Sequence, residues 1–273
     1  MKSNSALFVA SGVRKGFGGV VAVDVDEIAI QPGSLVSLIG PNGAGKTTFF
    51  DVVTGFLDAQ HGTVHFEGED ISGWDPYQIA RRGLVRTFQL TRVLARMTVI
   101  DNMRLAASDQ PGERLYGQVF PARIRRREAE ITARADGLLD RFSLTHLRDE
   151  YAGRLSGGQK KLLELARGLM VGPKMMLLDE PMAGVNPSLG EALLRYVLEL
   201  RDEGMTFLLV EHDMDVVMRV SERVIVMAAG QVLADGPPEA VRSDQRVIDA
   251  YLGEHAAEQI AAAEAHAREA GHD

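Results

Sequence analysis

The chain has 273 residues, of which 45% are hydrophobic, enough for one large domain or two modest ones with a sizeable core. Its formal net charge of −8 argues against a protein that coats nucleic acid, because neutralising phosphates requires a basic face. It contains no cysteine, which excludes disulfides, cysteine-ligated zinc and thiol catalysis.

No stretch of the sequence approaches the roughly 18 uninterrupted apolar residues that a membrane helix requires. The apolar run nearest the start, residues 6–10, is too short for the core of a secretory signal. We therefore expect a soluble, cytosolic chain that reaches a membrane only through a partner.

The N-terminal part predicts strands around one glycine-rich loop. Residues 35–39 form a continuous apolar run, which is typical of a strand buried on both faces. This strand leads into the loop, and a helix is expected over residues 46–54. Further short strands are expected at 7–10, 20–23, 28–30 and 62–66.

From about residue 90 helix-like segments replace the strand pattern. They are expected at 100–108, 123–142 and 156–170, and we interpret about 90–165 as an inserted helical lobe. Strands and helices then alternate, which favours a parallel α/β sheet. The alternating segments are 175–178, 187–203, 206–210, 214–220, 223–227 and 231–234.

The glycine-rich loop has the composition of a phosphate-binding site. Glycine can take positive φ, which lets backbone N–H groups approach phosphate oxygens, and the following helix adds its positive end. In this pattern Lys46 holds the β- and γ-phosphates and the Thr47 hydroxyl ligates magnesium. The alternative, a strand–turn–helix with incidental glycines, fits poorly with the apolar strand before the loop and the Lys-Thr-Thr after it. The loop residues are Gly40, Pro41, Asn42, Gly43, Ala44, Gly45, Lys46, Thr47 and Thr48.

Two acidic residues follow the apolar segment 175–178. Asp179 ends an apolar strand, where a lone carboxylate is costly unless a cation meets it, so it is the candidate to orient magnesium. Glu180 comes next, at the carboxyl edge where α/β sheets bind ligands, and can polarise an attacking water. The structural alternative for Asp-Glu-Pro is a turn or helix start, but the phosphate-binding loop favours the catalytic interpretation.

The pentapeptide Leu155-Ser156-Gly157-Gly158-Gln159 opens a predicted helix. A serine followed by glycines at a helix start can bind an anion, but it can also be a simple helix cap. Alone the pentapeptide favours capping, whereas the phosphate-binding loop elsewhere in the chain favours a second anion site. Gln89 and His212 are further polar candidates, although a lone glutamine or histidine at a strand end is usually a surface residue.

Together these motifs resemble the ATP-binding subunits of ABC transporters, over about residues 5–253. The resemblance is strongest to the ATPase subunits of branched-chain amino acid importers, the Liv type. It implies an α/β P-loop NTPase fold, a nucleotide-binding domain with an antiparallel β subdomain and an inserted α-helical subdomain at about 90–165. Residues 254–273 are expected to form a polar C-terminal tail. The runs that carry the resemblance are 37–48, 85–89, 97–102, 155–159, 175–180, 211–214 and 250–254.

The resemblance implies roles at matching positions. Phe17 is expected to stack on adenine, where many ABC proteins have a tyrosine. Gln89 is expected to join the magnesium shell and to report the nucleotide state to the membrane partner. His212 is expected to contact the γ-phosphate and to hold the attacking water with Glu180.

In the family the pentapeptide contacts the ATP bound by the opposite subunit, so two chains enclose two nucleotides head to tail. The side chains and backbone of Ser156, Gly157, Gly158 and Gln159 are therefore expected nucleotide contacts. Asn186 stands where many ABC ATPases have an aspartate, in the loop that crosses the dimer. Asparagine keeps hydrogen bonding without the charge and recurs in Liv-type subunits.

The implied function is hydrolysis of ATP, with Mg²⁺, to energise uptake of branched-chain or related amino acids from the cytoplasmic face of the membrane. The implied partners are integral-membrane permease subunits, a second ABC ATPase subunit in a homo- or heterodimer and, indirectly, an extracytoplasmic substrate-binding protein. No nucleic-acid partner is expected. The permease is expected to dock around residues 89–97, where Leu90, Val93, Leu94 and Met97 offer an apolar groove.

Other ABC systems, for urea or amide uptake or lipopolysaccharide-type export, stay as alternatives. A non-transport ABC ATPase usually carries a coiled-coil insertion or a second cassette, and neither is visible in this sequence. An inactive regulatory subunit conflicts with the intact Glu180 and His212.

The segment 109–128 is longer than in a minimal cassette. Its arginines, Arg123, Arg125, Arg126 and Arg127, predict a solvated helix start, or alternatively a contact with anionic lipid or a permease loop.

Overall fold

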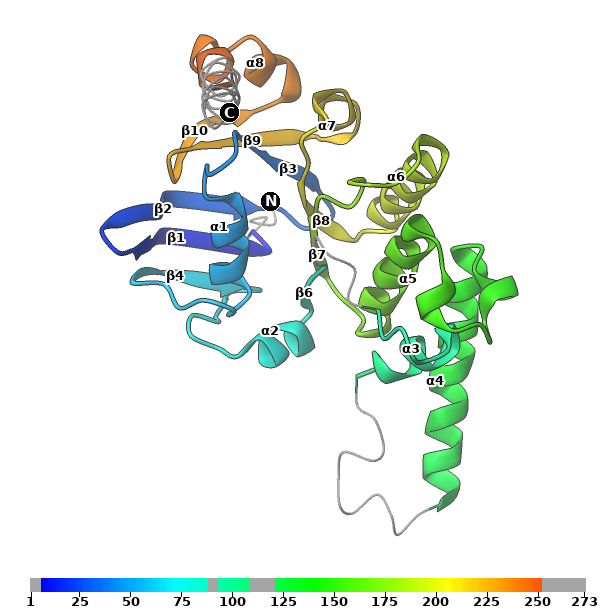
Figure 1. Cartoon of the computed structure of the whole chain (residues 1–273). Helices are drawn as coiled ribbons and strands as arrows, with labels where there is room; N and C mark the ends of the chain where they lie inside the picture. The colour runs from blue at the N-terminus through cyan, green and yellow to red at the C-terminus, as the bar shows by residue number, and fades with distance from the viewer. Residues whose placement is uncertain (1–5, 88–92, 109–120, 252–273) are drawn as a thin grey trace, which may run out of the picture. The chain divides into compact units, whose positions relative to one another are not determined.

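The computed structural model describes residues 6–87, 93–108 and 121–251 (Figure 1). The chain divides into two compact units. Unit 1 contains Met1–Gln31, Leu35–Gly73 and Leu209–Asp273, and unit 2 contains Pro32–Ser34 and Trp74–Leu208. Three sequence-based predictions lie outside the described residues, namely Gln89 with Leu90, most of the long segment that begins at residue 109, and the tail 254–273.

Unit 1 begins with an antiparallel sheet (Figure 1). Strands β1 (Phe8–Phe17) and β2 (Val20–Ile30) pair over almost their full length, and β4 (His61–Phe66) and β5 (Glu69–Asp70) extend the sheet in the order β2-β1-β4-β5. The β1–β2 turn is Gly18-Gly19, with φ of 50° and 93°. Positive φ at both turn residues matches the twist of the flanking strands, so the short predicted strands become one long hairpin.

The second sheet region of unit 1 contains β3 (Leu35–Ile39), β9 (Arg223–Ala228) and β10 (Gln231–Gly236). All five residues of β3 are buried, as the continuous apolar run predicts. β3 pairs parallel to β9, but β10 pairs antiparallel to it, so the prediction of a parallel arrangement is wrong for the last strand. The reason is the two-residue turn Ala229-Gly230, with φ of 49° and 83°, which is too short for a parallel crossover.

Helices complete unit 1. α1 (Lys46–Val53) packs against β1 and β2, while α7 (Met214–Val220) and α8 (Pro238–Arg242) accompany β9 and β10. α8 was not predicted, because five residues are too few to establish a helical period. The apolar cluster beside these last elements consists of Ile39, Val217, Val224, Val226, Ala234, Val241 and Val247.

Unit 2 contains a short parallel strand pair, β6 (Leu84–Arg86) with β7 (Met175–Asp179). It also contains the first three residues of β8 (Thr206–Val210), whose last two residues belong to unit 1. The helices are α2 (Pro76–Arg82), α3 (Val99–Leu105), α4 (Pro121–Arg141), α5 (Gly157–Met170) and α6 (Pro187–Asp202). Four of these five helices were predicted within a few residues of their ends. α2 and β6 are short and were missed. The predicted lobe boundaries at about 90 and 165 stay a prediction.

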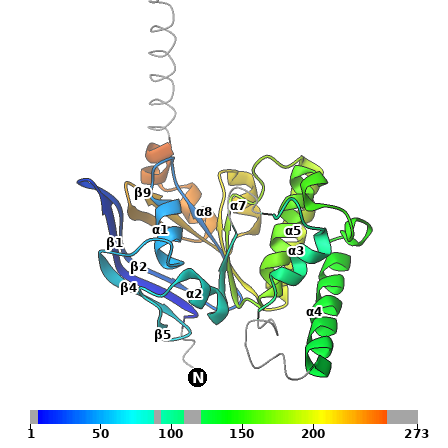
Figure 2. The same cartoon turned by 60° about the horizontal axis from the view of Figure 1, so that its bottom comes forward.

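The helices α3, α4 and α5 pack on one another (Figure 2). α4 contributes a narrow buried stripe, Ile131, Ala135 and Leu139, spaced four residues apart on one helix face. Its first turns carry the arginines 123 and 125–127, all exposed, and both Arg126 and Arg127 form ion pairs with Glu130. This is the solvated helix start that the charge pattern predicts.

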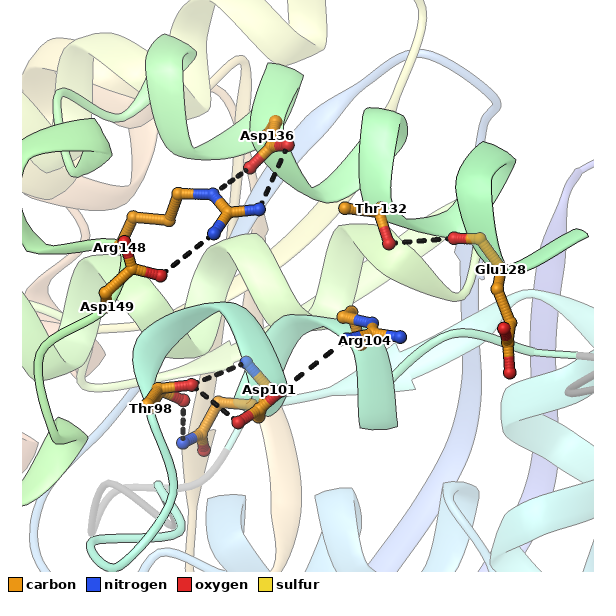
Figure 3. Close-up of polar contacts among 9 residues, drawn as sticks. Thr98, Asp101, Arg104, Glu128, Thr132, Asp136, Arg148 and Asp149 are labelled. Atoms are coloured by element: carbon orange, nitrogen blue, oxygen red, sulfur yellow. Dashed lines mark hydrogen bonds and ion pairs between the residues drawn. The ribbon is translucent and has the colours of Figure 1, made fainter. Parts of the chain in front are cut away.

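Polar contacts fix the ends of these helices (Figure 3). Thr98 caps α3, since its Oγ1 accepts a hydrogen bond from the Asp101 N–H at 3.2 Å. The Arg148 guanidinium donates to Asp136 of α4 at 2.7 Å and to Asp149 at 2.9 Å, which ties the chain after α4 back to that helix.

Candidate functional site

The loop between β3 and α1 is shaped by close backbone packing within unit 1. Gly40 has φ of 148°, and a Cβ there would lie 2.1 Å from the carbonyl oxygen of Met227. Gly45 has φ of 100°, and a Cβ there would lie 2.2 Å from the carbonyl oxygen of Ala22. Glycine is therefore required at both positions by its neighbours as well as by its backbone conformation.

α1 begins without a side-chain cap. Its N-cap residue is Gly45, which has no side chain to cap the first N–H groups of the helix. Lys46 is buried, and its Nζ donates to the carbonyl oxygens of Gly40 at 2.6 Å and Pro41 at 2.9 Å. Thr47 is exposed in the first turn. The loop thus combines a positive helix end with an ammonium group, which is the arrangement that binds phosphate.

In unit 2, Asp179 ends β7 with its side chain 2% exposed and accepts a hydrogen bond from Arg86 Nη2 at 2.9 Å. A buried carboxylate at this position calls for a cation, and the Arg86 guanidinium supplies that positive charge. The assignment of Asp179 to orient magnesium stays a prediction. Arg86 was missed as a site residue, because it meets Asp179 only through the pairing of β6 with β7.

Glu180 follows Asp179 with φ of 48°, in the left-handed region that non-glycine residues rarely adopt. Its carbonyl oxygen accepts from the N–H of Ala183 at 3.1 Å and from Lys161 Nζ at 3.0 Å. Lys161 lies on α5, two residues after the pentapeptide, and sequence reasoning did not select it. The backbone that presents the Glu180 carboxylate is thus held from two sides.

The pentapeptide begins α5 and makes a capping box. Ser156 Oγ accepts from the Gln159 N–H at 3.3 Å, and Gln159 Oε1 accepts from the Ser156 N–H at 2.9 Å. Ser156 therefore caps α5, and Gly157 lies exposed at the same helix end. The second anion site stays a prediction. Asn186 likewise caps α6, because its Oδ1 accepts from the Leu189 N–H at 2.9 Å.

The other predicted site residues lie in unit 1. Phe17 is 50% exposed at the end of β1, and Lys15 Nζ lies 5.6 Å from its ring centroid. His212 is exposed between β8 and α7, next to Asp213, which caps α7. Within the described residues no group of three or more His, Cys, Asp or Glu side chains could hold a metal ion.

Comparison with known proteins identifies the chain. The family model for ABC transporters matches residues 24–183, more than half of the chain. A second model, for branched-chain amino acid ATP-binding cassette transporters, matches residues 231–257. The chain belongs to the branched-chain amino acid family of ABC transporter ATP-binding proteins.

Relatives of this family are similar over nearly their whole length. A probable branched-chain amino acid transport ATP-binding protein LivG of Archaeoglobus fulgidus is 43% identical over 241 residues, 88% of this chain and 93% of the relative. The high-affinity branched-chain amino acid transport ATP-binding protein BraF of Pseudomonas aeruginosa is 41% identical over 247 residues, 89% of this chain and 96% of the relative.

Solved structures of ABC transporter cassettes have the same fold as this chain. A nucleotide-free ATP-binding cassette from an ABC transporter superposes with a TM-score of 0.78 at 39% identity, covering 90% of this chain and 98% of that one. A structure of an ABC transporter cassette in its ADP conformation gives a TM-score of 0.77 at 37% identity, covering 91% of this chain and 99% of that one.

The chain is therefore the ATP-binding subunit of a branched-chain amino acid ABC transporter, and an ABC transporter ATPase. This confirms the predicted family, fold class, enzyme class and function. In the described part of the chain, no helix is both long and apolar enough to cross a membrane.

Proposed function

We propose that the subunit hydrolyses ATP to drive the import of branched-chain or related amino acids, acting at the cytoplasmic face of the membrane. Its proposed partners are integral-membrane permease subunits, a second ABC ATPase subunit and, through the permease, an extracytoplasmic substrate-binding protein. The observation that carries the proposal is the uncapped start of α1 with the Lys46 ammonium inside the preceding loop. Family membership adds the transport context.

The loop residues 40–48 are proposed to bind the phosphates of ATP. Their backbone N–H groups and the positive end of α1 favour the anion, and Lys46 exchanges the carbonyls of Gly40 and Pro41 for phosphate oxygens. Phe17 is proposed to stack on adenine with its exposed ring. The pentapeptide 155–159 and Asn186 are proposed to act across a dimer, on the nucleotide of the opposite subunit.

Mg²⁺ suits the available donor atoms. Thr47 offers an exposed hydroxyl and Asp179 a carboxylate, and Mg²⁺ binds through one or two carboxylates together with substrate phosphates. Such a site needs no cluster of three acidic or histidine side chains. When bound, the ion neutralises charge on the phosphates. Gln89, which lies outside the described residues, is proposed to join this shell.

Hydrolysis is proposed to use Glu180 as the general base. A water oxygen attacks the γ-phosphorus, its proton passes to the Glu180 carboxylate, and the bond from the γ-phosphorus to the bridging oxygen breaks, with its electron pair leaving on ADP. The proton then passes to the released phosphate or to solvent. His212 is proposed to contact the γ-phosphate and to orient the water.

The permease is proposed to dock on the loop before α3. Leu94 is 39% exposed there, and the fully buried Asn102 holds the loop. The Asn102 amide donates to the Leu94 carbonyl at 3.1 Å and to the Thr98 carbonyl at 2.9 Å, and its Oδ1 accepts from the Leu94 N–H at 2.9 Å. An exposed apolar side chain on a segment held by these hydrogen bonds suits a docking surface.

The test is affinity purification of the Glu180→Gln variant with ATP from solubilised native membranes, followed by mass spectrometry. We expect two polytopic permeases and a second ATPase to be recovered with ATP and to be depleted in a matched preparation without nucleotide. Recovery of ribosomes, DNA or soluble proteins alone would contradict the transport role. The binding protein encoded beside those permeases can then be titrated with amino acids.

A further inference from the structure

One face of α5 packs closely against the segment that follows β7, within unit 2. A Cβ on Gly158 would lie 1.9 Å from Leu189 Cδ2, so glycine allows the Leu189 side chain to pack closely on the helix. One turn later, at the spacing that places residues on one helix face, Lys161 Nζ donates to the Glu180 carbonyl at 3.0 Å. The helix that starts with the pentapeptide therefore also supports the backbone of Glu180.

The backbone of Glu180 needs such support. Its φ of 48° lies in a region that is unfavourable for a residue with a Cβ, and such conformations persist only where the surroundings hold them. Two donors meet its carbonyl, the Ala183 N–H at 3.1 Å and the Lys161 ammonium at 3.0 Å. The first bond closes the local turn, and the second is charge-assisted and comes from another element.

The position of that carbonyl constrains the direction in which the Glu180 side chain leaves the backbone. Fixing the peptide plane after Glu180 fixes its ψ, and together with φ this sets the direction of the Cα–Cβ bond. A general base must lie within hydrogen-bond reach of its water, so a small backbone rotation changes the reacting geometry. Lys161 is half-buried, which limits competition from solvent for its ammonium group.

We propose that Lys161 is a positioning residue for ATP hydrolysis: its ammonium group holds the left-handed backbone of Glu180 and so orients the carboxylate toward the attacking water. This inference rests on the proposed role of Glu180 as general base. Lys161 itself contacts neither nucleotide nor water in this scheme. Its removal should therefore slow turnover and leave the affinity for ATP unchanged.

The experiment compares Lys161→Met, Lys161→Arg and Lys160→Met in the assembled transporter. Lys160 is the neighbouring lysine on α5 and is also half-buried, so it controls for loss of charge and volume on this helix. We expect Lys161→Met to lower kcat by about tenfold or more with KM for ATP changed by less than about twofold. Lys161→Arg, which keeps a cationic donor, should retain most of the activity, and Lys160→Met should match the wild type.

A second comparison shows whether Lys161 acts through Glu180. In a Glu180→Gln background the base is already lost, so adding Lys161→Met should cause little further loss in single-turnover hydrolysis. Equal losses in both backgrounds, a wild-type kcat for Lys161→Met, or a raised KM with unchanged kcat would each overturn the inference. If Lys161→Met does not fold, Lys161→Gln replaces it and is read by the same criteria. A Glu180→Gln variant that turns over normally would instead overturn the proposed base.

Discussion

Lys46 is the residue on which the nucleotide-binding proposal depends most directly. Its ammonium group is buried and bonded to two carbonyls of the loop that it follows, so it is already placed beside the N–H groups at the start of α1. Those carbonyls are neutral acceptors, whereas a polyphosphate carries several negative charges, so Coulombic attraction to the ammonium group favours the phosphate.

Lys46→Ala should therefore lower the affinity for ATP by at least about tenfold, which corresponds to about 1.4 kcal/mol. Isothermal titration with ATP measures this, with Lys160→Ala as the control that should bind normally. Unchanged affinity in Lys46→Ala would contradict the assignment of the loop.

The sequence was enough to predict functional residues that belong to a motif of consecutive residues. It was not enough to predict residues whose partners lie far away along the chain. The loop from Gly40 to Thr47 could be recognised because its function follows from consecutive residues. Arg86 and Lys161 could not, since each meets its partner only through tertiary structure, across 93 and 19 residues of sequence. The buried Asp179 was identified correctly as an exceptional carboxylate, but its charge partner in the fold is an arginine.

At the scale of elements, length decided which predictions succeeded. α4, α5 and α6 are long enough for a helical period to be visible, and their predicted ends differ from the structure by a few residues at most. β1 and β2 were predicted as short pieces because polar residues interrupt their apolar runs, yet the Gly18-Gly19 turn pairs them continuously. The antiparallel direction of β10 depends on the turn length, which the strand pattern alone does not encode.

Asn102 gives a prediction for the start of α3. Asn102→Ala removes partners from the Leu94 N–H and from the carbonyls of Leu94 and Thr98, so it should lower the free energy of unfolding by about 1–3 kcal/mol. Urea denaturation measures this. Asp101→Asn, at the neighbouring half-exposed position, should cost less than about 1 kcal/mol. Equal effects of the two substitutions would show that Asn102 does not hold the loop.

The ends of α4 and α6 are joined by an ion pair that depends on pH. Arg141 donates from Nη1 and Nη2 to the two carboxylate oxygens of Glu203, each at 2.8 Å. This hydrogen bonding holds the pKa of Glu203 below its usual value of 4.5. A carboxyl group with a lowered folded-state pKa contributes stability above the unfolded pKa and loses it as pH falls through the folded pKa.

Arg141→Met should therefore destabilise the protein at pH 7 by no more than about 1 kcal/mol, because the pair is partly exposed and screened by solvent. The difference from the wild type should shrink below about pH 4 and vanish once Glu203 is protonated in both states. Thermal denaturation of both proteins across this pH range measures it. A difference that is constant with pH would mean that Arg141 acts by packing alone.

At the scale of the whole molecule, the proposed mechanism requires two nucleotide-binding subunits to close on ATP. Glu180→Gln should bind ATP, hydrolyse it far more slowly and so accumulate the closed dimer. Light scattering should then find twice the 29.7 kDa mass of the chain with ATP, and the single mass with ADP. A variant that stays monomeric at saturating ATP would contradict closure between copies of this chain and would point to a different sister subunit.

The phosphate-binding loop is synthesised long before the residues that pack against it. The loop is translated early, but Gly40 packs against the Met227 carbonyl, and the Ala44 carbonyl accepts from the N–H of Gly230. A ribosome that adds about 5–20 residues per second takes on the order of 10 to 40 s to travel from the loop to that turn. Throughout this interval the phosphate-binding loop of the nascent chain lacks its contacts with Met227 and Gly230. ATP should therefore stabilise only chains that have been synthesised past residue 230, so nucleotide binding reports that this turn has formed.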